Sequence, residues 1–154
     1  MATALAKYWK NSIPAPQGAP YSTLAVSKET AVTPGATNDI RKIFKVPRNV
    51  TFGAGTFVQI GDMDTGAGLV FTLRITDDGV AFKKLIDAST AGQAGGLARP
   101  SKGPATEDAI GFTTDSNAWW VEILWATAAA GAQAADLIVG VELSGFYLTG
   151  AVPE

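Results

Sequence analysis

The chain has 154 residues, of which 47 % are hydrophobic and 17 % are charged, and its formal net charge is −2. It contains no histidine and no cysteine, which excludes Ser-His-Asp triads, Cys-His pairs and metal sites built from imidazoles or thiolates. Because charged residues usually make up about 25 % of a domain, we expect part of this apolar surface to be buried against other subunits.

Basic and acidic residues are unevenly distributed along the chain. Residues 1–48 hold seven basic and two acidic residues, whereas residues 49–154 hold five basic and twelve acidic residues. The basic front is expected to lie on its own acidic body, on a neighbouring copy or on another acidic surface. The net negative charge argues against nucleic-acid binding, and no apolar run is long enough to predict a signal peptide or a membrane span.

Residues 1–21 are predicted to form an extended N-terminal arm. Three prolines between residues 14 and 20 oppose both helix formation and sheet pairing. Apolar side chains in such an arm are costly to expose, so the arm is expected to order on a partner surface. The predicted partner-binding residues are Lys7, Tyr8, Trp9, Lys10 and Ile13.

Residues 22–154 are predicted to form one domain of short β-strands. Residues 40–46 and 56–61 are predicted strands, and residues 69–76 and 80–86 alternate around an Asp77-Asp78-Gly79 turn, which predicts a hairpin. Residues 87–105 are small and flexible in composition, which predicts a long loop. Further strands are predicted over residues 109–113, 118–126 and 137–144, with an Ala-rich link at 127–135.

Seven or eight such strands predict an all-β fold, an antiparallel β-sandwich or a jelly-roll-like domain. Alternation places four residues of the segment 118–126 on one face, which we expect in the core: Trp119, Val121, Ile123 and Trp125. Apolar residues on the outward faces predict self-association, and these residues are Val70, Trp120, Leu124 and Ile138.

One segment resembles a catalytic motif. Asp64-Thr65-Gly66-Ala67 is similar to the Asp-Thr-Gly-Ala of retroviral-type aspartic proteases, which act as homodimers, and Ile138-Val139-Gly140 loosely fits their second element. The residues before the Asp in that family are normally apolar, whereas here they include Gly61 and Asp62. The alternative is a simple turn. Asp62 and Asp64 also offer oxygen ligands for calcium, although no later acidic ligand of an EF-hand follows.

Three other residues allow two interpretations each. Glu122 and Glu142 could form the carboxylate pair of a glycosidase, or could pair across strands with Arg74, Lys83 or another basic residue. Trp120 could be a platform for a sugar ring or an anchor in a protein interface, and we favour the interface. We expect no catalytic residue, no cofactor and no resident metal.

The whole pattern resembles the capsid decoration (cement) proteins of tailed bacteriophages. The resemblance rests on the arm Tyr8–Pro20, on the hairpin from Leu69 to Gly79, and on Trp119–Trp125 with the Ala-rich segment that follows it. It implies a β-rich trimer on the outside of an icosahedral head, where it clamps the major capsid protein lattice.

From these features we expect a non-enzymatic virion protein, made in the host cytoplasm and placed on the outer capsid surface. Its expected partners are the major capsid protein and two further copies of itself, with no nucleic acid and no membrane. Two alternatives stay open. One is a glycan- or receptor-binding module of a phage tail or fibre, and the other is the dimeric aspartic protease.

Overall fold

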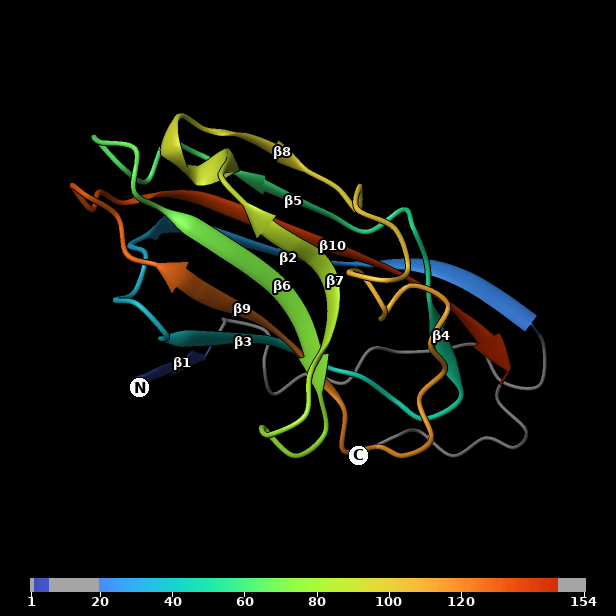
Figure 1. The fold of residues 1–154 in the computed structure, drawn as a ribbon. Helices are drawn as coiled ribbons and strands as arrows, with labels where there is room; N and C mark the ends of the chain where they lie inside the picture. The colour runs from blue at the N-terminus through green and yellow to red at the C-terminus, as the bar shows by residue number, and fades with distance from the viewer. Residues whose placement is uncertain (1, 6–19, 147–154) are drawn as a thin grey trace.

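The computed structural model describes residues 2–5 and 20–146, which form two β-sheets packed face to face (Figure 1). Sheet A has the strand order β1-β3-β9-β6-β7, and sheet B has the order β2-β10-β5-β8, with β4 beside β10. The strands are β1 Thr3–Leu5, β2 Pro20–Val32, β3 Ile40–Lys45, β4 Val50–Phe52, β5 Phe57–Ile60, β6 Val70–Thr76, β7 Lys83–Ser89, β8 Gly96–Ala98, β9 Trp120–Thr127 and β10 Ala135–Phe146.

This arrangement confirms the predicted all-β sandwich. Every ladder is antiparallel except that of β1, which pairs in parallel with β3. Within the described residues, the one helical element is the 3₁₀ turn Ala91–Gln93, and no helix is long and apolar enough to cross a membrane.

The core lies between the two sheets and follows the predicted alternation. The inward face of β9, with Trp119 just before it, is buried, and so is the inward face of β10. The ring of Trp125 meets the ring of Phe71 edge to face, with 6.4 Å between their centroids. The buried residues of these two strands are Trp119, Val121, Ile123, Trp125, Leu137, Val139, Val141 and Leu143.

The predicted hairpin is confirmed as β6 and β7, but its turn is longer than expected. Gly79 has a φ of 75°, as the turn requires. Val80 and Phe82 were expected to begin the returning strand. They lie instead in the turn, because the carboxylate of Asp78 accepts hydrogen bonds from the amides of Val80 and Ala81 and holds these residues out of the ladder.

Three other expectations are wrong. Residues 87–105 are not one loop, because they contain the end of β7, the 3₁₀ turn and β8. Residues 109–113 form turns rather than a strand, since Gly111 adopts a φ of 82° and only Thr113 makes a β-bridge, to Thr51. Between residues 22 and 48 only 40–46 were predicted as a strand, but this stretch also contains most of the long strand β2.

The first strand lies inside the predicted arm. The amide of Ala2 donates to the carboxylate of Asp39 at 2.7 Å, and the amide of Ile40 donates to the carbonyl of Ala2 at 2.9 Å. The start of the chain is therefore held at the edge of sheet A, beside β3.

One buried side chain in sheet B has no hydrogen-bond partner among the residues that the structure describes. It is Ser27 on β2, whose hydroxyl is unpaired there although β2 and β10 pair along almost their whole length. By contrast, the buried hydroxyl of Thr114 donates to the carbonyl of Pro47 at 2.7 Å and accepts from the amide of Val50 at 3.2 Å.

We predict that Ser27→Ala leaves the free energy of unfolding unchanged or raises it by up to about 1 kcal/mol, because it removes a hydroxyl that folding dehydrates without a partner. The matched variant Thr114→Val should lower it by about 1–3 kcal/mol, since it leaves the Val50 amide without that acceptor. Urea denaturation measures both. A loss in Ser27→Ala as large as that in Thr114→Val would contradict the prediction.

Candidate functional site

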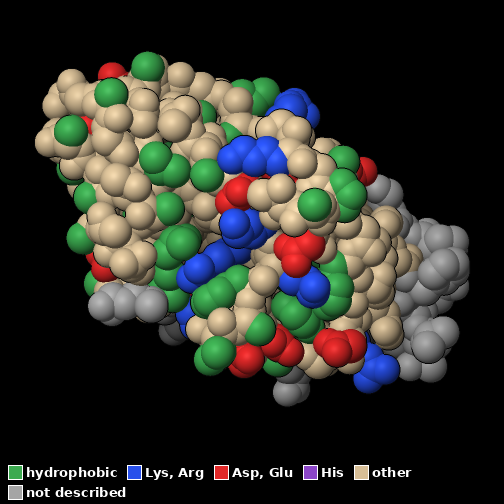
Figure 2. All heavy atoms as spheres, viewed as in Figure 1, with side chains coloured by type: hydrophobic (Ala, Val, Ile, Leu, Met, Phe, Trp, Pro, Cys, Tyr) green, Lys and Arg blue, Asp and Glu red, His purple; other side chains and the backbone are tan. Residues whose placement is uncertain are grey.

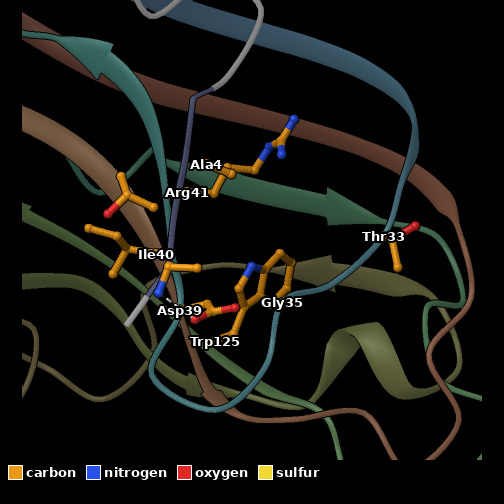
Figure 3. A pocket seen from close by; sticks show the side chains of 9 residues that line it. Ala4, Thr33, Gly35, Asp39, Ile40, Arg41 and Trp125 are labelled. Carbon is orange, nitrogen blue, oxygen red and sulfur yellow. Dashed lines mark hydrogen bonds between the residues drawn. The ribbon is translucent and has the colours of Figure 1, made fainter.

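The predicted partner-binding residues Lys7, Tyr8, Trp9, Lys10 and Ile13 lie outside the described residues. The structure does describe β1, which belongs to the predicted arm. Beside β1 is a small pocket of about 120 Å³, and Figure 3 shows Asp39, Arg41 and Trp125 among its lining side chains. Asp39 fixes both sides of this pocket, because its carboxylate accepts from the amides of Ala2 and Ala36.

The outer face of sheet A carries a row of charged side chains that crosses four strands. Strand register places Lys42, Glu122, Arg74 and Lys84 next to one another on β3, β9, β6 and β7. Glu122 is completely buried, and its Oε1 accepts from the Nε of Arg74 at 2.7 Å. The expected cross-strand ion pair of Glu122 with Arg74 is therefore confirmed.

Aromatic rings cover this ion pair from two sides. The guanidinium carbon of Arg74 lies 3.5 Å from the ring centroid of Phe82, and the indole nitrogen of Trp120 donates to Oε2 of Glu122 at 2.6 Å. The ammonium of Lys42 lies 4.1 Å from the Trp120 ring centroid. The rings and the paired charges explain how a carboxylate is buried on an outward face.

The charges around this row are paired locally. Figure 2 shows Lys and Arg side chains next to Asp and Glu side chains across the middle of the face, near β6 and β7. Lys84 and Lys102 both approach the carboxylate of Asp87, at 2.8 and 3.8 Å, and Lys83 lies 3.7 Å from Asp108. Positive and negative side chains are therefore mixed in this part of the face, which is not a basic patch.

The two mid-strand glutamates do not share a site. Glu142 projects from the outer face of sheet B, whereas Glu122 projects from the outer face of sheet A, so the two are on opposite sides of the sandwich. The carboxylate of Glu142 accepts from the amide of Gly55 at 2.5 Å and fixes the turn before β5. The arrangement does not form the carboxylate pair that a glycosidase requires.

Asp64, the residue of the protease-like motif, is buried and holds two loops together. Its two carboxylate oxygens accept four backbone hydrogen bonds of 2.8–3.0 Å, from Gly66, Gly68, Leu69 and Gly131. The loop of Gly131 comes so close that a Cβ there would lie 2.0 Å from the hydroxyl oxygen of Thr65.

Burial raises the pKa of Asp64, but the backbone hydrogen bonds outweigh this effect and hold the pKa well below its usual range. The second aspartate, Asp62, accepts from the amide of Asp64 at 3.1 Å. Across the described residues, no three acidic side chains come together in a group that could hold a metal ion.

Sequence reasoning did not single out a third buried carboxylate, Glu107. It accepts from the amides of Ser101, Lys102 and Gly103, and from the amide of Asp87 on β7. A hollow of about 440 Å³ lies beside it, lined mainly by Ala54, Pro100, Pro104 and Ile110. No sequence pattern reveals this role, because the partners of the carboxylate are backbone amides.

The four residues predicted for self-association lie on both outer faces. Val70, Trp120 and Leu124 belong to sheet A, and Ile138 belongs to sheet B, and each is half-buried within the single chain. The ring and the indole N–H of Trp120 both have partners in the same chain. The structure therefore leaves Trp120 less available than its position in the sequence suggests.

Removing one partner of the buried ion pair should be strongly destabilising. We predict that Arg74→Met lowers the free energy of unfolding by about 3–5 kcal/mol, because it leaves the Glu122 charge buried without compensation. The double variant Arg74→Met with Glu122→Leu should recover most of this loss. The exposed pair provides a control, since Lys83→Met should cost at most about 1 kcal/mol. A double variant no more stable than Arg74→Met would contradict this account.

The depressed pKa of Asp64 makes part of the stability depend on pH. The folded-state pKa lies below the unfolded value of about 3.9, so the contribution is present above that pH and is lost as pH falls toward the folded-state pKa. We predict that Asp64→Asn is less stable than wild type at neutral pH and that this difference shrinks below about pH 4. Thermal melts of both proteins and of the exposed-site control Asp136→Asn measure this effect. An equal deficit at every pH would contradict it.

No family model and no curated protein match this chain. Two solved structures have a similar fold. A chain of the capsid of Ralstonia phage GP4 aligns with a TM-score of 0.74 and 20 % identity, and the alignment covers 96 % of this chain and 100 % of that chain. A chain of the Cyanophage Pam1 capsid asymmetric unit aligns with a TM-score of 0.56 and 19 % identity, over 88 % of this chain and 94 % of that chain. The structural neighbours of this fold are thus phage capsid proteins.

Proposed function

We propose that this protein is a non-enzymatic structural protein of a phage virion. In this proposal it is a decoration protein that binds the outside of an icosahedral capsid as a homotrimer and stabilises the lattice of the major capsid protein. The observation that carries the proposal is the fold match to the GP4 capsid chain, which extends over all of that chain and nearly all of this one. In the GP4 capsid, a whole chain thus has this fold.

The internal hydrogen bonds of the sandwich support a role for this protein in resisting mechanical force. Each of the buried carboxylates of Asp64, Glu107 and Glu122 is held by hydrogen bonds within the chain. Such fixed groups stiffen the loops and the outer face, whereas a catalytic carboxylate needs access to a substrate. A rigid domain passes force between the subunits that it contacts.

In the proposed mechanism, the arm binds the capsid through Lys7, Tyr8, Trp9, Lys10 and Ile13. Hydrogen bonds at Ala2 and Asp39 hold one end of the arm, and β2 holds the other. Tethering at both ends reduces the conformational entropy lost on binding. Three arms in one trimer would bind with an avidity about 10²–10⁴ times the affinity of one arm.

Self-association is proposed to use the outward apolar residues. Val70, Trp120, Leu124 and Ile138 are half-buried within one chain, so a second copy could cover what remains of each. Because the four residues lie on two sheets, each copy would present two different faces to its neighbours.

Aromatic residues of the arm are predicted to provide most of its affinity. The variant Tyr8→Ala with Trp9→Ala should bind capsids that lack the protein at least about 100-fold more weakly than wild type, since buried aromatic side chains dominate interfaces. It leaves β1 and β2 intact, unlike deletion of residues 1–21. Co-sedimentation with purified capsids measures the binding.

The matched control is Lys102→Ala, an exposed change outside the arm that should bind capsids as wild type does. Undiminished binding by the double variant would remove the arm from the mechanism. Failure of the wild-type protein to bind any capsid of its phage would overturn the proposed function itself.

A further inference from the structure

The exposed large apolar side chains of the described residues fall in two separate places. Leu24, Val26 and Leu97 are 48 %, 47 % and 52 % exposed and lie on the outer side of sheet B. Val80 and Phe82 are 80 % and 37 % exposed and lie in the turn between β6 and β7. Clusters of exposed apolar side chains usually mark surfaces that contact another molecule.

The first place, which we call the sheet B face, carries apolar side chains on β2, β10, β5 and β8, with polar side chains between them. Register aligns Val26, Gly140 and Phe57 in one row, and Lys28, Ile138, Gln59 and Leu97 in the next. Because Gly140 lacks a side chain, the ring of Phe57 lies over it, where a Cβ would come within 2.3 Å of the ring. The face therefore has no ridge between β2 and β5.

The margins of the sheet B face are basic. Lys28 is exposed at the β2 side, and Arg99 is exposed at the β8 side, with its guanidinium 5.9 Å from the Phe57 ring centroid. In the part of the chain that the structure describes, neither residue forms an ion pair. Two outward carboxylates lie on β10: Glu142, opposite Leu24, is turned toward the Gly55 amide, and Asp136 is exposed two positions before Ile138.

The second place is the β6–β7 turn formed by residues 77–82, and its charged residues are acidic rather than basic. Val80 is exposed in this turn and follows Asp77 and Asp78 in the sequence. Asp78 accepts from the amides of Val80 and Ala81, at 2.7 and 2.9 Å, and these hydrogen bonds lower its pKa, so it stays charged at neutral pH. A Cβ added at Gly79 would lie 3.8 Å from the ring of Trp120, so the turn lies close to that ring. The backbone of the turn is therefore held by hydrogen bonds, and it presents an exposed apolar side chain that follows two acidic residues.

We propose that the β6–β7 turn of one copy docks on the sheet B face of a second copy. Val80 meets the apolar rows around Leu24 and Val26, and the aspartates approach the basic margins at Lys28 and Arg99. The two surfaces are different, so head-to-tail contacts between successive copies can close into a ring, as the homotrimer of the proposed function requires. This inference rests on the self-association within the proposed function and not on capsid binding.

The test uses one variant for each surface. Val80→Lys places a cation in the apolar contact, on the face whose margins carry Lys28 and Arg99, and Leu24→Glu places a carboxylate in the same contact, facing the turn that carries Asp77 and Asp78. Both positions are exposed, so both variants should fold, which circular dichroism checks. Each variant alone should dissociate with a dissociation constant at least about tenfold above that of wild type, because the apolar contact is lost and like charges meet.

Mixing the two variants tests whether the turn of one copy contacts the sheet B face of another copy. The Leu24→Glu copy keeps a normal turn, and the Val80→Lys copy keeps a normal sheet B face. An equimolar mixture should therefore associate where neither variant does. Light scattering over about 1 µM to 1 mM measures the mass, and the control Ala105→Glu, exposed outside both surfaces, should behave as wild type.

Three results would overturn the inference: a wild-type protein that is monomeric throughout the range, either variant associating as tightly as wild type, or a mixture that stays monomeric. Capsid co-sedimentation of the same variants separates this inference from the proposed function. Monomeric variants that still bind capsids leave decoration standing, whereas wild-type oligomers that bind no capsid contradict decoration and leave the docking intact.

Discussion

Hydrogen bonds from backbone amides to carboxylates hold this sandwich together at its loops. Asp64 joins the loop before β6 to the loop before β10, Glu107 ties the segment after β8 to β7, and Asp39 holds the first strand at the edge of sheet A. A small domain with long connections must satisfy many loop amides, and a charged acceptor does so with strong bonds. Without these groups the two sheets would still pack, but the turns around them would not keep one shape.

Because carboxylates have this structural role, the uneven distribution of charge along the sequence must be interpreted differently. The sequence suggests an acidic body available to a basic partner segment. In the structure, Asp64, Glu107 and Glu122 are buried. The carboxylates of Asp78 and Glu142 accept hydrogen bonds from the backbone amides of Val80 and Gly55. Several carboxylates are therefore engaged within the domain, and in the β6–β7 turn Asp77 and Asp78 precede the exposed Val80.

Much of the fold could be predicted because period-two alternation is a local signal. It identifies β6, β9 and β10 and their inward faces, since large apolar residues mark every second position. It fails on β2, where the inward residues Ala25, Ser27 and Glu29 are small or polar and the larger Leu24 and Val26 point outward. The segment 109–113 fails for another reason, because Gly111 takes a left-handed conformation that the apolar pattern does not reveal.

The interaction surfaces were harder to predict than the strands. Trp120 has the size and position of an interface anchor, but tertiary contacts with Glu122 and Lys42 engage it. The sheet B face depends on which residues of β2, β10, β5 and β8 lie side by side, and strand order is not contained in any local pattern. Only Ile138 of that face was identified in advance, from its place on an outward strand position.

The central claim is that this protein belongs to the outer surface of a phage head, and labelling of intact virions tests it most directly. Because the chain has no cysteine, a single Ala105→Cys substitution at an exposed site allows gold labelling without other modification. Electron microscopy of virions assembled with this variant should show label distributed over the outside of the head in many copies. Label confined to the tail or its fibres, or virions that contain none of the protein, would contradict the account.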